Sequence, residues 1–215
     1  GDDYTILDFF SGTASTADAI LQLNVNTNGH RNYIMVQYPE PCAENSEAYR
    51  RGFANVCDIG KERIRITSKR LTQENPDVKF DGGVRVLKVD ESNMNNIFYS
   101  PEEYNQNLLS ILESNIKTER TALDLLFGSL LEWGLPLSLP YNSEEIDGCT
   151  IHDYNNGDLI ACFDENIPDC VIKLIAKKQP LRAVFRDSSF ANSPSKINVG
   201  EIFKSLAPDT KVKVI

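Results

Sequence analysis

The run Ile6-Leu7-Asp8-Phe9-Phe10-Ser11-Gly12-Thr13-Ala14-Ser15-Thr16 decides the fold of the first half of the chain. Its apolar start predicts a short strand over 4–8, its small residues predict a loop, and the residues that follow predict a helix over 14–23. A loop of small residues lets the backbone approach a ligand closely, and the amides at the start of the next helix attract an anion. The alternative is a strand-to-helix turn that binds nothing.

A second apolar segment, 33–38, reads Tyr-Ile-Met-Val-Gln-Tyr and ends at Pro39 and Pro41. Nearly continuous apolar runs of this kind are typical of buried parallel strands, so the first 40 residues predict a βαβ unit. A charged helix over 58–72 and a strand over 84–89 should follow. Basic side chains on that helix are expected to form a solvated face: Lys61, Arg63, Arg65, Lys69 and Arg70.

The second half of the chain begins with helices. Ser100-Pro101-Glu102-Glu103 has the order of a helix N-terminus, and a second helix is expected over 119–133. The remainder predicts a hairpin turning at 155–158, then a helix, a strand over 181–186, a helix over 194–206 and a final strand over 212–215. A shift in composition near 139–143 places the expected boundary between a domain 1–140 and a C-terminal α/β unit 141–215.

Composition excludes several classes of protein. The 215 residues are 41% apolar and 25% charged, as in ordinary globular domains. The longest apolar stretch, 123–139, is interrupted by charged residues and the N-terminus is acidic, so we expect no membrane span, no signal peptide and a soluble cytoplasmic protein. A net charge of −9 means that any nucleic acid must be held by another segment. Five cysteines without a CxxC pair predict reduced thiols and no metal site.

Residues 8–16 resemble the D-x-F-x-G-S-G-T-T motif of the DNA methyltransferases that act on exocyclic amines. Further stretches are similar to the modification (Mod) subunits of type III restriction systems, and together they extend the resemblance over nearly all of residues 4–215. They are Leu21-Gln22-Leu23-Asn24, 31–41, 58–65, Val184-Phe185-Arg186-Asp187-Ser188-Ser189-Phe190 and Lys196-Ile197-Asn198-Val199.

The resemblance implies an α/β fold, namely a Rossmann-like half of an S-adenosylmethionine-dependent methyltransferase with an appended C-terminal α/β unit. It implies methylation of the exocyclic amine of adenine in duplex DNA, with a restriction (Res) subunit and a second Mod chain as partners. The cofactor would be S-adenosylmethionine, its methionine carboxylate held at the helix start. The loop residues that would bind it are Asp8, Phe9, Phe10, Ser11, Gly12, Thr13, Ala14, Ser15 and Thr16.

Two positions depart from the pattern of the resembling family. Ala14 replaces the second glycine and Thr13 replaces a serine; because alanine tolerates a helical φ, we expect the loop to keep its shape. Where many methyltransferases place an acid against the ribose hydroxyls, this chain has Gln37, and Glu40 is the nearest acid. An amide can bond both hydroxyls, which favours Gln37 without excluding Glu40. Asp58 is expected to cap its own helix.

No catalytic residue is expected in this chain. Adenine methyltransferases of this kind hold the flipped base with an Asp-Pro-Pro-Tyr-like tetrapeptide, and the sequence contains no Pro-Pro dipeptide. In the resembling family the tetrapeptide precedes the cofactor motif, so the chain is expected to be part of a longer protein and inactive alone. His30 and His152 lack partners at ligand spacing, and Asp187 is expected to form a turn.

The sequence leaves two other functions to compare with this one. In the first, the C-terminal unit docks the restriction subunit or a second Mod chain, and the chain alone binds no cofactor. In the second, the chain is a nicotinamide-dependent enzyme. Gly12 is the only glycine of the loop, whereas the dinucleotide fingerprint needs three, so the second is disfavoured.

Overall fold

The computed structural model describes residues 3–95, 115–190 and 193–215. They divide into two compact units, one reaching to Leu87 and the other comprising Lys88–Ile215. The helix expected from Ser100 lies outside the described residues. Within the described ranges, none of the helices combines the length and the apolar character that a bilayer crossing requires.

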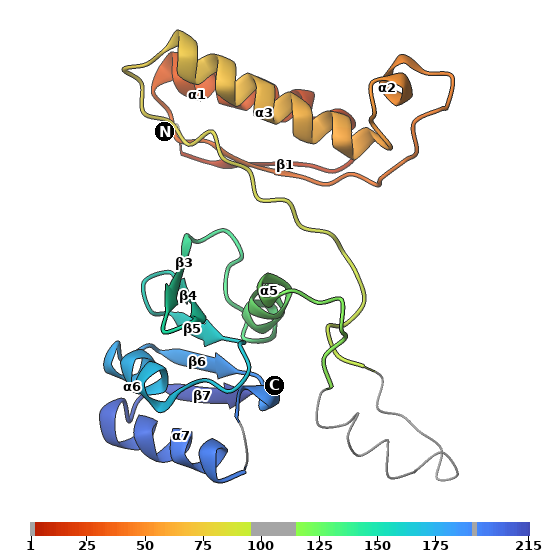
Figure 1. The fold of residues 1–215 in the computed structure, drawn as a ribbon. Coiled ribbons are helices and arrows are strands. Elements are labelled where there is room, and N and C mark those ends of the chain that lie inside the picture. The colour runs from red at the N-terminus through yellow and green to blue at the C-terminus, as the bar shows by residue number, and fades with distance from the viewer. Residues whose placement is uncertain (1–2, 96–114, 191–192) are drawn as a thin grey trace, which may run out of the picture. The chain divides into compact units, whose positions relative to one another are not determined.

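The first unit is built on the predicted βαβ arrangement. β1 (Thr5–Asp8) and β2 (Asn32–Met35) pair in parallel, and α1 (Ser15–Thr27) connects them. A single helical turn, α2 (Glu47–Arg50), precedes the long helix α3 (Val56–Glu74). Figure 1 shows α1 and α3 running along the same side of the two strands.

The core of this unit lies between α1 and α3. Both helices carry apolar residues that return to one face every three to four positions or at small multiples of that spacing, which is the pattern that buries a helix stripe. The buried residues are Ala17, Leu21 and Val25 of α1 and Ile64 and Leu71 of α3. Both predicted helices are therefore confirmed, and each extends beyond its predicted end.

The strand predicted over 84–89 is wrong. This segment forms no strand, and Val84, Val86 and Val89 expose their side chains. A strand requires a neighbouring backbone to satisfy its N–H and C=O groups, and no described strand pairs with this one. Its alternating β-branched residues have a high β-propensity, but without a pairing strand this propensity does not produce a strand.

The second unit contains a five-stranded mixed sheet in the order β3-β4-β5-β6-β7. β3 (Tyr141–Ile146), β4 (Cys149–Tyr154) and β5 (Leu159–Cys162) form an antiparallel meander. β6 (Arg182–Phe185) and β7 (Lys211–Val214) continue the sheet in parallel with β5. The strands predicted over 181–186 and 212–215 are thus confirmed.

Helices cover both faces of this sheet, which makes three layers (Figure 1). α6 (Asp169–Lys177) and α7 (Ser193–Leu206) are the crossovers between the parallel strands, and both pack on one face. α5 (Ala122–Glu132) packs on the other face, where it buries Leu126 and Leu130 against the sheet. Each face therefore has its own apolar cluster.

The sequence missed β3. The turn between β3 and β4 is Asp147-Gly148, and both residues have positive φ (49° and 75°), as two-residue hairpin turns require. The Asp-Gly dipeptide was the available signal, but the polar residues of 141–146 obscured the strand. The hairpin predicted at 155–158 does join β4 to β5, with Asn155, Asn156 and Gly157 all at positive φ.

The two units divide at Leu87, whereas composition placed a boundary near residue 140. The difference concerns α5, which the sequence assigns to the first domain. Its buried leucines contact Tyr154 and Val184 of the C-terminal sheet, so burial of apolar surface holds α5 to the second unit.

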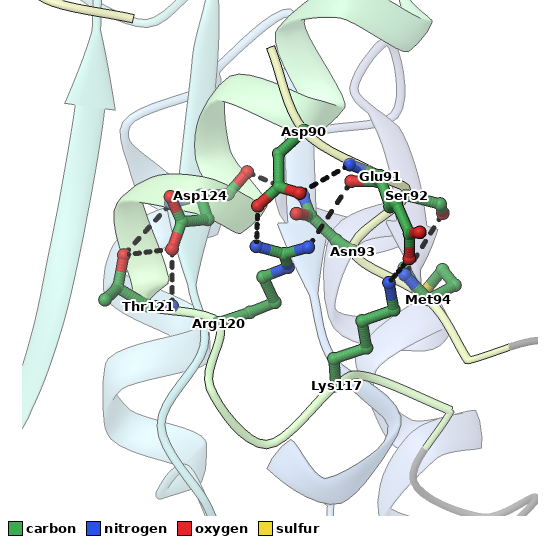
Figure 2. Close-up of polar contacts among 9 residues, drawn as sticks. All are labelled: Asp90, Glu91, Ser92, Asn93, Met94, Lys117, Arg120, Thr121 and Asp124. Atoms are coloured by element: carbon green, nitrogen blue, oxygen red, sulfur yellow. Dashed lines mark hydrogen bonds and ion pairs between the residues drawn. The ribbon is translucent and has the colours of Figure 1, made fainter. Parts of the chain in front are cut away.

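Ion pairs and a hydrogen bond attach the start of the second unit to the residues just before α5 and to its first turn, as Figure 2 shows. Asp90 accepts from Arg120 Nη1 at 2.7 Å, and Glu91 accepts from Lys117 Nζ at 2.9 Å. Asn93 donates its side-chain amide to the Asp124 carbonyl at 2.8 Å. These contacts join two segments that lie about 30 residues apart in the sequence.

α5 begins with a reciprocal capping box. The Thr121 hydroxyl accepts the amide of Asp124, and the Asp124 carboxylate accepts the amide of Thr121. We expect Thr121→Ala to lower the free energy of unfolding of the second unit by about 1 kcal/mol, because one helix donor loses its acceptor. Urea unfolding followed by the fluorescence of Trp133, the single tryptophan, measures this loss. Thr121→Ser is the control and should remain near wild type; equal midpoints for the alanine and serine variants would contradict the role of the cap.

Candidate functional site

The loop between β1 and α1 has an unusual backbone. Phe10, Gly12 and Ala14 all lie in the left-handed region, with φ of 70°, 55° and 59°. Glycine adopts this conformation freely, but a side chain raises its energy, by roughly 1–2 kcal/mol for ordinary residues. The expectation that Ala14 takes a helical φ is therefore wrong: its φ and ψ of 59° and 39° are left-handed, which is where the resembling motif has glycine.

α1 begins at Ser15 without a side-chain cap. Ala14 occupies the N-cap position, and its methyl group cannot accept from the amides of the first turn. Asp18 is an acid of the first turn, but it accepts from Gln22 and from Thr67 of α3. The first-turn amides therefore carry the partial positive charge of the helix N-terminus without a capping side chain.

Hydrogen bonds attach the loop to the end of β2. The carbonyl of Val36 accepts from the amides of Phe10 (2.9 Å) and Ser11 (3.2 Å). The Gly12 amide donates to Gln37 Oε1 at 2.8 Å, and Gln37 Nε2 donates to the Tyr38 carbonyl at 3.0 Å. The structure thus brings Gln37 and the loop between β1 and α1 together, as the candidate site requires.

The other predicted site residues occupy different places. Asp8, at the end of β1, accepts from the Thr16 hydroxyl at 2.6 Å and so joins the strand to the first turn of α1. Phe9 and Phe10 belong to the loop itself and are exposed; 90% of the surface of Phe10 is accessible to solvent. Among the described contacts, Glu40 takes part through its backbone: its amide donates to the Tyr38 carbonyl, and its carbonyl accepts from Val56.

α3 also contacts the loop, through Arg63 and Gly60. Arg63 donates from Nε to the Thr13 carbonyl at 2.7 Å and from Nη2 to the Thr13 hydroxyl at 3.2 Å. A Cβ built on Gly60 would lie 3.3 Å from that of Ala14, so glycine permits the close approach of α3. Arg63 was expected on a solvated face. Because the two partners lie 50 residues apart, no local pattern in the sequence indicates this contact.

Asp58 does not cap α3. Asn55 is the N-cap, and its side chain accepts from the Asp58 amide at 3.1 Å. Asp58 lies in the first turn, where its hydrogen bond with Lys61 holds the pKa of its carboxyl below the ordinary value. The described contacts of Asp58 therefore stabilise the helix start.

His152 and Asp187 belong to the second unit. His152 is buried in β4, where Nδ1 lies 2.7 Å from the Ser143 hydroxyl, and burial lowers the pKa of its imidazole. Asp187 begins a short 3-10 turn after β6 and pairs with Lys196. The turn predicted at Asp187 is confirmed.

The chain matches no protein-family model. It is 37% identical over 70 residues to the type III restriction-modification enzyme EcoPI Mod subunit of Escherichia phage P1, which covers 33% of this chain and 11% of that protein. It is 30% identical over 83 residues to the StyLTI Mod subunit of Salmonella typhimurium, covering 39% of the chain and 13% of the subunit. It is 35% identical over 78 residues to the type II methyltransferase M.KpnI of Klebsiella pneumoniae, covering 36% and 18%.

These matches span between about a tenth and a fifth of the length of the relatives. They confirm a resemblance to Mod subunits and, more broadly, to methyltransferases over 33–39% of this chain. The wider resemblance over residues 4–215 stays a prediction.

We expect Arg63→Ala to speed amide hydrogen exchange in the loop, because Thr13 loses one hydrogen bond at its backbone carbonyl and one at its side-chain hydroxyl. Exchange measured by NMR at the Ala14 amide, which donates to the Ser11 carbonyl, reports the change. Arg65→Ala is the matched control: Arg65 lies on the same helix and pairs with Glu62 at the surface. Equal exchange in the two variants would contradict the role assigned to Arg63.

Proposed function

We propose that the chain carries the S-adenosylmethionine-binding part of a site-specific DNA methyltransferase that methylates the exocyclic amine of adenine in a type III restriction-modification system. The observation that carries this proposal is the loop of residues 9–14, which joins β1 to the uncapped start of α1 and is bonded to Gln37 at the end of β2. The similarity to Mod subunits and to a type II methyltransferase supports the class of reaction.

The residues of the loop suit the cofactor in this proposal. The first-turn amides of α1 would bind the methionine carboxylate, because they present positive partial charge without a capping side chain. The left-handed backbone at Gly12 leaves open space where a Cβ would stand. Bound there, S-adenosylmethionine supplies the methyl group, and this chain binds and orients it.

Gln37 would bind the ribose hydroxyls. Its side chain already lies against the loop, whereas the described contacts of Glu40 involve its backbone. An amide donates and accepts, so it can bond a diol as a carboxylate does while adding no charge. This choice also explains why the end of β2 needs no acid.

The intact protein, in this proposal, holds duplex DNA and the flipped adenine with residues outside the chain. The chain contains no Pro-Pro dipeptide, and its net charge of −9 disfavours an independent grip on phosphates. The Mod relatives are subunits of type III restriction-modification enzymes, so a restriction subunit and a second Mod chain are the proposed partners.

The alternative function is an interaction module formed by the C-terminal unit, without cofactor binding by the chain in isolation. The observation that favours it is the self-sufficient core of Lys88–Ile215, in which helices cover both faces of the sheet.

Calorimetric titration with S-adenosylmethionine tests the proposal. We expect one binding event for the wild-type chain and an affinity about tenfold weaker for Gln37→Ala, the equivalent of about 1.4 kcal/mol from lost hydrogen bonds. Glu40→Ala is the matched control and should bind as wild type does. Absence of binding to the folded chain would contradict the proposal, and capture of the restriction subunit by that same chain would then establish the alternative. A loss confined to Glu40→Ala would move the ribose contact to Glu40.

A further inference from the structure

The second unit, which does not contain the proposed cofactor loop, brings three potential metal ligands together. Cys149, Cys162 and Asp164 each offer one ligand atom, and these atoms all lie within 4.8 Å of one another. Both cysteines are buried, at 4% and 0% exposure, and Asp164 is half-buried. No part of the proposed function uses these side chains.

The sheet explains how residues so far apart in the sequence meet. Cys149 is the first residue of β4, and Cys162 is the last of β5. These strands are antiparallel with Ile151 opposite Cys162, so Cys149 stands two residues along from that pair, on the same face. Asp164 lies two residues after the end of β5 and completes the cluster there. Both thiols thus project from paired strands, which hold ligands more firmly than loops do.

The spacing agrees with zinc coordination. Zinc–sulfur bonds of about 2.3 Å and zinc–oxygen bonds of about 2.0–2.2 Å put neighbouring ligand atoms of a tetrahedron about 3.5–3.8 Å apart. Cys162 Sγ lies 3.8 Å from Asp164 Oδ2. The Thr150 amide donates to the same carboxylate at 2.5 Å and fixes its orientation, as hydrogen bonds around metal ligands commonly do.

Without an ion, the cluster is held by a sulfur hydrogen bond in which Cys162 Sγ donates to Asp164 Oδ2. A divalent cation would take the place of this bond, and its positive charge would stabilise both thiolates beside the carboxylate.

We propose that Cys149, Cys162 and Asp164 form a zinc-binding site that joins β4 to the segment after β5. Two sulfur ligands select a soft or borderline ion over Mg²⁺ and Ca²⁺, which prefer oxygen. As the ion binds, each thiol releases its proton to solvent, Asp164 coordinates through a carboxylate oxygen, and nothing is oxidised or reduced. A water molecule takes the fourth position. The cysteine pattern in the sequence predicted no metal site because the thirteen-residue separation matches no ligand motif; the sheet pairing supplies the proximity.

Titration of the reduced, metal-stripped chain with Co²⁺ tests the site, because cobalt bound to thiolates absorbs in the near ultraviolet. We expect this absorption to saturate at one equivalent and to disappear when Zn²⁺ is added. Cys149→Ala and Cys162→Ala should each lose most of it, and Asp164→Asn should bind at least roughly tenfold more weakly. Cys42→Ala and Cys57→Ala are matched controls in the first unit and should titrate as wild type does.

A second measurement separates loss of the site from loss of the fold. Zn²⁺ should raise the thermal midpoint of the wild-type second unit, followed by Trp133 fluorescence, and leave that of Asp164→Asn nearly unchanged at the same concentration. Mg²⁺ should raise neither. The proposal is overturned if Co²⁺ gives no thiolate absorption with the folded chain, or if that absorption survives in Cys149→Ala and Cys162→Ala but is lost in the Cys42 and Cys57 variants.

Discussion

The hydrogen bond from the Gly12 amide to Gln37 Oε1, 2.8 Å long, joins the loop after β1 to the segment after β2, and the candidate site depends on it. The loop it holds contains non-glycine residues at positive φ, Phe10 and Ala14, which a free loop would not keep. Contacts from two sides compensate this cost: Val36 and Gln37 bond the loop from β2, and Arg63 bonds it from α3. The shape of the loop is therefore a property of the whole first unit.

The two units differ in how they are stabilised. In the first, a pair of helices covers one side of two short strands, and apolar residues such as Leu7 and Ile34, which face each other across the strands, are half exposed on the other side. In the second, helices on both faces enclose a five-stranded sheet with fully buried residues such as Tyr154 and Phe185. The second unit thus has the apolar burial expected of an independently stable domain, while the first unit carries the loop on which the proposed function rests.

The sequence predicted correctly those elements whose formation depends on residues close together in the chain. The strand-loop-helix run at 6–16, the hairpin at 155–158 and the helix over 194–206 are confirmed because small residues, turn residues and helical periodicity act over a few positions. The strand at 84–89 is wrong because strands need partners that the local sequence cannot specify. The boundary predicted near residue 140 divides α5 from the sheet that buries its leucines, because composition does not show which elements pack together.

Within the candidate site, the sequence predicted which segments would meet and missed how they are held. Gln37 lies against the loop as expected. The loop follows β1, Gln37 follows β2, and the two strands are parallel neighbours, so their carboxyl ends meet at one edge. The left-handed backbone of Ala14 departs from a preference that alanine follows elsewhere, and tertiary contacts impose it. Arg63 bonds Thr13 across 50 residues of sequence, and only the packed structure brings the two together. In the second unit, Cys149 and Cys162 likewise come close only because their strands pair.

The most direct test of the central claim is an NMR titration of the ¹⁵N-labelled chain with S-adenosylhomocysteine, the demethylated form of the proposed cofactor. The account predicts that the amides of Gly12, Ser15 and Thr16 and the side-chain amide of Gln37 shift together, with one dissociation constant, while residues of the second unit stay in place. A titration in which these signals do not move, or in which shifts are confined to Lys88–Ile215, would contradict it.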